Sequence, residues 1–408
     1  MLSPDNSVPL GRRVAYWRVR RQLSQQVFAD RLGKSKSWVD KIERGVRRLD
    51  RVSVLREIAD ALRIDVAQLV LAVDGAQPPA GAQVGDGVAR IREVLARYDT
   101  IVTPSGPSYP PVTDLRQAVA HGWLSFQYGR YDRLFRGLPR LLAEVQAHRG
   151  RHGDTESAVL LCQAYQLTAV LLRKVGQTPV AWVAADRAVA VGGAVGDEVL
   201  TARAVSTLGG VVRELGQPRR AYELCVAVAH RLAAPDQPVG EWRSVHGFLL
   251  LQAAMCAAQL GDDSAVTQLV DQAGDVAELV GPGENHHWTA FGPPLVEGVR
   301  IAAAVTLGDP VTAVARHERA RTRPGYGWLP PGTRADHLVD AAHGYAHLDD
   351  LPAAGRALLA ADRIAPPEVR LRPHAHAVLT TVLRGTPRPD PLLVRLAEAC
   401  GLTAHLAR

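Results

Sequence analysis

A run of donor-rich side chains near residue 40 has the chemistry to contact nucleic acid. Ser35, Lys36 and Ser37 are consecutive, and Lys41 follows four residues later. A lysine ammonium can donate to guanine O6 and N7, and a serine hydroxyl can bond to either type of base. The surrounding residues 1–74 hold 15 Lys and Arg against 9 Asp and Glu, in a chain whose formal net charge is +7. A basic segment attached to an almost neutral remainder is typical of a polyanion-binding domain.

The chain around these residues has the pattern of two short helices joined by a tight turn. We predict a first helix between Ser24 and Gly33. A second helix follows between Ser35 and Gly45. Serine side chains cap helix starts, and glycine adopts the positive φ with which many helices end. Two such helices, with the small residue Ala29 where they cross, can project the second helix into a DNA major groove.

This stretch resembles the Cro/XRE family of helix-turn-helix repressors. The residues that carry the resemblance are Arg18, Leu23-Ser24-Gln25, Ala29, Leu32-Gly33, Val39 and Ile42-Glu43-Arg44-Gly45. Residues 55–62, with Ile64 and Leu69, match the fourth and fifth helices of the family. The resemblance implies a five-helix, repressor-type domain within residues 1–74, which we call the head. It also implies that the partner is double-stranded DNA, bound by a homodimer at a near-palindromic operator.

The resemblance also assigns roles to individual side chains of the head. It gives base-edge contacts to Ser35, Lys36, Ser37 and Lys41. It gives contacts with backbone phosphates to Gln25, Arg47, Arg48 and Arg51, and the arginines can instead enter the minor groove. Arg18 and Glu43 match a partly buried ion pair that joins the first helix to the recognition helix.

Three features of the head depart from the family pattern. Lys34 replaces an apolar turn residue, and the segment from Val46 to Val54 is slightly longer than usual. Trp38 adds a large ring to the recognition helix. We interpret Trp38 as half-buried support for that helix, and the alternative is contact with a base or a methyl group. The orientation of the helix and the roles of the arginines depend on these departures.

Composition divides the rest of the chain into two segments. A Pro- and Gly-rich connector covers residues 75–112, and an Ala-, Leu- and Val-rich region covers residues 113–408. Within the connector, one apolar stripe predicts a short amphipathic helix over residues 88–98. The stripe consists of Val88, Ile91, Val94, Leu95 and Tyr98. This helix is free to dock on the head, on the C-terminal region or on a second subunit.

A turn phrase recurs every 40–47 residues along the C-terminal region. Its copies are centred on Gly129, Gly176, Gly216, Gly261, Gly308 and, with aspartate in place of glycine, Asp349. Glycine at positive φ ends the helix before each turn, and proline suits the first turn of the helix after it. The prolines are Pro179, Pro218, Pro310 and Pro352. With no strand pattern, these signals predict an all-α fold in which six or seven tetratricopeptide-like hairpins form an α-solenoid.

The C-terminal region resembles the tetratricopeptide-like solenoids of actinobacterial XRE regulators, which share the phrase Trp-Thr-Ala-Phe-Gly-Pro found at residues 288–293. Its architecture is also similar to that of peptide-sensing regulators with a repressor-type head. Concave solenoid faces bind ligands through the first helix of each hairpin. Candidate groove residues within those helices are Gln163, Gln166, Arg203, Arg243, His246, Gln252, Trp288 and Arg300. The arginines suit an acidic group, although each residue can instead bond between helices or lie at the rim.

Other classes of function lack their motifs in this sequence. No nucleotide-binding glycine loop, nucleophile elbow or HExxH motif is present, so we expect neither enzymatic activity nor a cofactor. The pairs His286-His287 and His374 with His376 lack partners at metal-ligand spacing, so we expect no metal. The four cysteines lie in apolar stretches and are expected to be reduced core residues. No membrane span or signal segment is evident, which predicts a cytoplasmic protein with no membrane partner.

The sequence therefore predicts a DNA-binding transcription regulator with a helix-turn-helix head. In the leading hypothesis, the solenoid binds a small molecule or a peptide, forms the dimer, or does both. In one alternative, the solenoid recruits a protein partner without any small effector. In another, the chain is a helical scaffold that the basic head localises on DNA.

Overall fold

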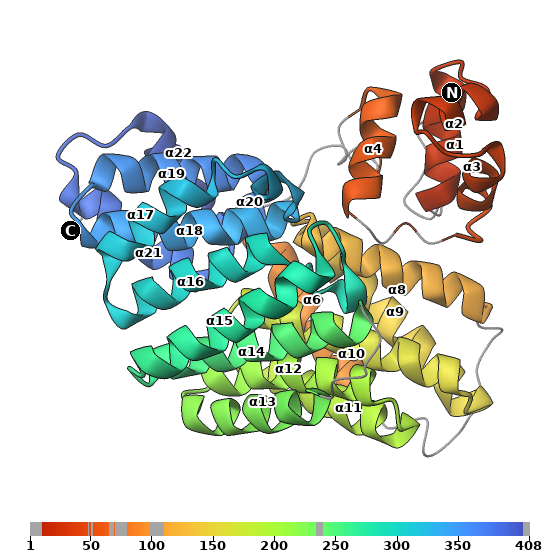
Figure 1. Cartoon of the computed structure of the whole chain (residues 1–408), viewed down its shortest axis with the longest axis horizontal. Helices are drawn as coiled ribbons and strands as arrows, with labels where there is room; N and C mark the ends of the chain where they lie inside the picture. Colours follow the sequence, from red (N-terminus) through yellow and green to blue (C-terminus); the bar gives the residue numbers. More distant parts are fainter. Residues whose placement is uncertain are drawn as a thin grey trace.

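The computed structural model of the chain describes residues 10–47, 49, 52–64, 69, 80–97, 110–233 and 240–402. Every regular element in these ranges is a helix. Figure 1 shows a small group of N-terminal helices beside a larger, layered set of helices. The predicted all-α class, with a separate head and a repeat region, is confirmed.

The head has four described helices. They are α1 (Leu10–Arg20), α2 (Gln25–Arg31), α3 (Lys36–Glu43) and α4 (Val52–Leu62). Ser24 and Ser35 cap α2 and α3 as predicted, because each hydroxyl accepts a bond from the backbone N–H three residues later. The predicted fifth helix falls in a segment of which the structure describes Leu69, and this side chain is fully buried in the head core.

The predicted connector helix is α6 (Ala80–Leu95), which begins eight residues earlier than predicted and ends three residues sooner. Its apolar stripe packs on α9 (Tyr131–His152), and Ile91 is fully buried there. The backbones approach closely, because a Cβ at Gly87 would meet Phe135 at 2.5 Å. Of the stripe, Tyr98 lies outside the described residues. The helix therefore docks on the repeat region, and we call α6 and α8–α22 together the body.

Six hairpins of the body have the predicted turn, and a seventh pair follows them. The hairpins are α8 (Val112–Gln127) with α9, α10 (Thr155–Lys174) with α11 (Thr178–Val195), α12 (Glu198–Glu214) with α13 (Pro218–Leu232), α14 (Glu241–Gln259) with α15 (Asp263–Val280), α16 (Pro293–Leu307) with α17 (Pro310–Ala320), and α18 (Pro331–His347) with α19 (Leu351–Ile364). The turn glycines have φ values from +65° to +80°, and Asp349 has a φ of +59°. The short α20 (Pro366–Arg370) leads to α21 (Pro373–Gly385) and α22 (Pro391–Ala399).

The solenoid formed by the body is closed on itself, because its last helices contact its first hairpins. The Lys174 ammonium at the end of α10 is 2.9 Å from Asp336 Oδ2 on α18 and 2.9 Å from Glu368 Oε2 on α20. Arg372 Nη1 lies 3.1 Å from the same Glu368 oxygen and also bonds to Asp336. Glu368 is buried, and the Tyr131 hydroxyl of α9 donates to it. Charged groups of both ends thus satisfy one another inside the body.

One apolar stretch among the described residues, His286–Leu307, has the length and composition that a membrane span requires. Core helices of soluble proteins pass the same test, and here the helical part is α16, of 15 residues. At 1.5 Å per residue, α16 spans about 22 Å, less than the roughly 30 Å of a bilayer core. The cysteines are free, as predicted, and Cys162, Cys225 and Cys256 are buried.

Candidate nucleic-acid interface and ligand groove

Helix α3 presents its predicted base-contacting residues to solvent. The apolar spacing of the helix turns Val39 and Ile42 into the head core. Ser35, Lys36, Ser37 and Lys41 are exposed. Figure 1 shows α3 on the outer side of the head, and Gly45, just after α3, approaches Gln117 of α8. The four side chains therefore lie on the solvent-facing surface of the docked head.

A bidentate ion pair fixes the position of α3 against α1. Arg18 Nε lies 2.6 Å from Glu43 Oε1, and Arg18 Nη2 lies 3.0 Å from Glu43 Oε2. The two side chains are only 13% and 7% exposed, so the pair is partly buried as predicted. Gln25 Nε2 donates to Glu43 Oε2 at 2.8 Å. Because an amide nitrogen carries two hydrogens, Gln25 keeps one for a phosphate.

Trp38 of α3 is half-buried, which agrees with the favoured interpretation of its role. Its ring packs against the head core. Lys34 Nζ lies 6.0 Å from the ring centroid, and the Arg47 guanidinium lies 5.8 Å from it. Sequence reasoning missed this pairing, because the chain reverses at Gly45, which has a φ of +76°. Of the predicted phosphate contacts, Arg47 is exposed, and Arg48 and Arg51 lie outside the described residues.

The head is docked on α8 through polar and apolar contacts that the sequence did not predict. Leu124 of α8 and Tyr128, the residue just after α8, belong to the same buried cluster as the core of the head. Arg13 of α1 is 1% exposed, and its Nη2 lies 3.0 Å from His121 Nδ1. Arginine is only a donor, so Nδ1 is the acceptor and the His121 ring is neutral. Burial, followed by the charges of Arg13 and Arg133, lowers the pKa of His121 to about 3.

Two of the predicted groove residues, Gln166 and Arg300, are engaged by other side chains of the body. Gln166 is buried and donates to Cys162 Sγ within α10. Arg300 forms an ion pair with Asp271 of α15 at 2.8 Å, so it joins two helices. Both contacts match the alternative that these polar side chains bond within or between helices. Gln163, Arg243, His246 and Gln252 are half-buried on α10 and α14.

Two groove candidates, Arg203 and Trp288, come together inside the body. Arg203 Nε donates to the carbonyl of His287 at 3.1 Å, next to Trp288. The expectation that Trp288 lies within a first helix is wrong, because it ends a single 3-10 turn, η1 (His286–Trp288), in the loop of residues 281–292 before α16. Trp288 has a φ of +60°, and Ala290 has a φ of +50°. Pro293 at the first turn of α16 then starts the helix five residues after Trp288.

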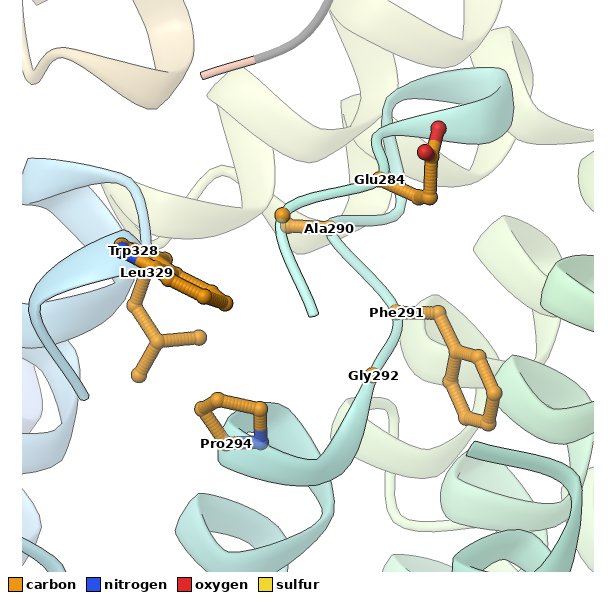
Figure 2. Close-up of a pocket in the computed structure, with 8 residues that line it drawn as sticks. Glu284, Ala290, Phe291, Gly292, Pro294, Trp328 and Leu329 are labelled. Carbon is orange, nitrogen blue, oxygen red and sulfur yellow. The ribbon is translucent and has the colours of Figure 1, made fainter. Parts of the chain in front are cut away.

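The same loop also forms one wall of a small hollow next to the head. Figure 2 shows Glu284, Ala290, Gly292 and Pro294 on one side and Trp328 with Leu329 on the other. The space within it corresponds to roughly one water molecule. A Cβ at Gly283 would lie 3.4 Å from Ser53 of α4. The loop that lines the hollow therefore contacts the head. The hollow itself is too small for an organic effector.

Three of the four histidines that the sequence singled out have a carboxylate neighbour. His286 Nε2 lies 3.4 Å from Glu284, and His287 Nε2 lies 3.5 Å from Glu241. His374 Nε2 lies 3.8 Å from Asp340, whereas His376 bonds to the carbonyl of Arg370. Within the described ranges, no three His, Cys, Asp or Glu side chains are grouped to hold a metal ion.

Comparison with known protein families gives a match to the head. Residues 9–71 match a family model described as a helix-turn-helix domain. The head is a helix-turn-helix domain. The match covers the capped helices α2 and α3 and the Arg18–Glu43 pair. No curated protein matches the chain in sequence.

Two solved structures are similar over most of the chain. One is Bacillus thuringiensis PlcR in complex with the peptide PapR7 and DNA, at 12% identity and a TM-score of 0.34, covering 77% of this chain and 93% of that one. The other is a mutant of PrgX, at 8% identity and a TM-score of 0.32, covering 84% of this chain and 95% of that one. Likeness at this level carries neither the fold nor the ligands of those proteins over to this chain.

Proposed function

We propose that this protein is a sequence-specific, cytoplasmic transcription regulator that binds a near-palindromic operator as a homodimer and responds to an effector held by its body. It acts by binding and has no enzymatic activity. One observation carries the proposal: in the docked head, the four predicted base-contacting residues of α3 are exposed. A helix of this length with a Lys- and Ser-bearing outer side fits the major groove and its acceptor-rich guanine edges.

Selection of binding sites from a random-sequence DNA library tests the proposal. We expect the full chain to enrich one motif with two related halves, because a two-fold dimer contacts two half-sites about one helical turn apart. Sedimentation of the complex should give two protomers per duplex. Failure to enrich any motif would contradict sequence-specific binding, and one protomer per duplex would contradict the dimer.

The selected motif then allows side-chain roles to be separated. Lys36→Ala should lose about 1–3 kcal/mol of preference for the motif over random DNA, since Lys36 is assigned to a base edge. Arg47→Ala should weaken binding to both DNAs alike and lower the salt dependence, since Arg47 is assigned to phosphate. Equal losses on both DNAs for Lys36→Ala, measured by fluorescence anisotropy, would refute the base-contact assignment.

A second candidate function is recruitment of a protein partner by the body, with no small effector. It is supported by α11, whose outer face exposes Trp182 and Val183 at 49% and 37%. Large exposed apolar side chains that lie together are typical of protein contacts. In cells, Trp182→Ser should then abolish regulation of a reporter gene without weakening operator binding. Unchanged regulation would remove this support.

A further inference from the structure

Arg203 is a buried cation without a described carboxylate partner. It lies on α12 and is 4% exposed. Its Nη1 donates to the hydroxyls of Ser206 and Thr207 at 3.1 and 2.6 Å, and its Nε donates to the His287 carbonyl. Burial lowers the pKa of Arg203 to about 10, so the guanidinium is still charged at neutral pH. A buried charge balanced only by neutral dipoles is costly, and an anion would supply the missing counter-charge.

Aromatic rings enclose this guanidinium. It lies 5.5 Å from the ring centroid of Trp123 on α8 and 5.2 Å from that of Phe248 on α14. Trp123 in turn stacks on Trp288, with centroids 6.3 Å apart and planes within 3° of parallel. The surroundings thus combine a flat stacking surface with a cationic hydrogen-bond donor. This combination suits a planar aromatic group that carries a nearby acceptor or negative charge.

The chain itself fills this place in a strained conformation. His287, Trp288 and Ala290 have φ values of +49°, +60° and +50°, a region that costs energy for residues other than glycine. Two hydrogen bonds between side-chain amides hold the loop. Gln127 Nε2 donates to Asn285 Oδ1 at 3.0 Å, and Asn285 Nδ2 donates to Gln127 Oε1 at 2.9 Å. Release of the loop would relieve this backbone strain, and the strain therefore favours replacement of the loop by a ligand.

We propose that Arg203, Trp123 and Phe248 form a binding site for an aromatic carboxylate, and that residues 285–291 of the chain occupy it when no ligand is bound. The ligand ring replaces the Trp288 indole against Trp123, and its carboxylate replaces the His287 carbonyl at Arg203. This proposal rests on the effector-binding part of the proposed function, and it names the chemical class of that effector. The displaced loop reaches the head, because Trp288 also packs against the head core.

Calorimetric titration of the full chain with two matched compounds tests the site. N-acetyl-L-tryptophan carries the ring and a carboxylate, and N-acetyl-L-tryptophanamide is its neutral counterpart. The acid should bind about tenfold more tightly, as expected for a charge-assisted bond to arginine. Arg203→Gln should remove this preference, whereas Arg213→Gln on the same helix should keep it. Equal binding of acid and amide by the unaltered chain would overturn the proposal.

Two substitutions in the loop test the exchange, also in case Arg203→Gln fails to fold. Trp288→Ala removes the internal occupant and should tighten binding of N-acetyl-L-tryptophan by about fivefold or more. Ala290→Gly relieves strain in the closed loop, because glycine adopts positive φ freely, and should weaken binding by a similar factor. Effects in the same direction, or no binding to the Trp288→Ala variant, would overturn the proposal.

Two further titrations identify the source of the carboxylate. Tighter binding of Ala-Ala-Trp than of indole-3-acetate would indicate a peptide C-terminus, and the reverse order a small aromatic acid. Operator binding is measured on the same samples without ligand. Loss of the ligand site alone leaves operator binding intact, whereas failure of the proposed function removes operator binding itself.

Discussion

The Arg18–Glu43 pair is the residue-scale feature on which the position of α3 depends. Loss of one partner of a buried pair leaves the other charge uncompensated. We expect Arg18→Met to lower the free energy of unfolding by about 3–5 kcal/mol, as measured in urea. The double variant Arg18→Met/Glu43→Leu should lose clearly less, because no charge is left unpaired. A double variant as unstable as the single one would contradict this account.

Individual residues of the head were predictable from sequence because their roles are local. Ser24 and Ser35 cap helices that begin beside them, and the partners Arg18 and Glu43 lie in neighbouring elements of one small domain. Arg203 was predicted as a groove residue because it is a polar residue in the first helix of a hairpin. Besides Ser206 and Thr207 on its own helix, its partners come from three other elements, at positions 123, 248 and 287, which spacing in the sequence could not reveal.

At the scale of elements, the turn glycines of the repeats set where each hairpin bends. Gly216 has a φ of +78° and no neighbouring atom within reach of an added Cβ, so the cost of a side chain there is purely conformational. Gly216→Ala should therefore lose about 1–2 kcal/mol of stability. Gly298, inside α16 with equally open surroundings, is the matched control, and Gly298→Ala should gain up to about 1 kcal/mol. Thermal unfolding would show shifts of opposite sign, and equal shifts would contradict the assignment.

The hairpins themselves were predictable because each one repeats a local signal of glycine and proline. The docking of α6 was not, since its stripe fitted three possible surfaces equally well. The burial of the stripe and the close approach of Gly87 to Phe135 place the helix on the body. The loop at 281–292 was also missed, because the phrase around Trp288 has the apolar content of a helix.

At the scale of the whole molecule, the head is attached to the body through a pH-sensitive contact. The folded-state pKa of His121 is lowered from 6.5 to about 3, by burial first and then by Arg13 and Arg133. The neutral ring therefore contributes stability above pH 6.5, and that contribution is lost as the pH falls from 6.5 toward 3.

The non-titrating variant His121→Gln isolates this effect. Between pH 7.5 and pH 5, the unaltered chain should lose about 2 kcal/mol more stability than the variant, from 1.36 kcal/mol per pH unit. Chemical denaturation at the two pH values measures the difference. Identical pH dependence of both proteins would show that His121 does not couple docking to pH.

Closure of the solenoid is the whole-molecule feature that no sequence pattern predicted. Lys174 contacts Asp336 and Glu368 across more than 160 residues, and the repeats that hold Lys174 and Asp336 have complete patterns without these contacts. An open solenoid and a closed one have the same local signals. The difference lies in the small rotation between successive hairpins, which accumulates over the body.

Methylation interference on the selected operator tests most directly the claim that α3 contacts base edges. A methyl group on guanine N7 projects into the major groove, where it blocks an approaching lysine. We predict that N7-methylation of at least one guanine in each half-site prevents binding of the unaltered chain, and that Lys36→Ala becomes insensitive at that position. Binding that tolerates every methylated guanine, or the same interference pattern for both proteins, would contradict the account.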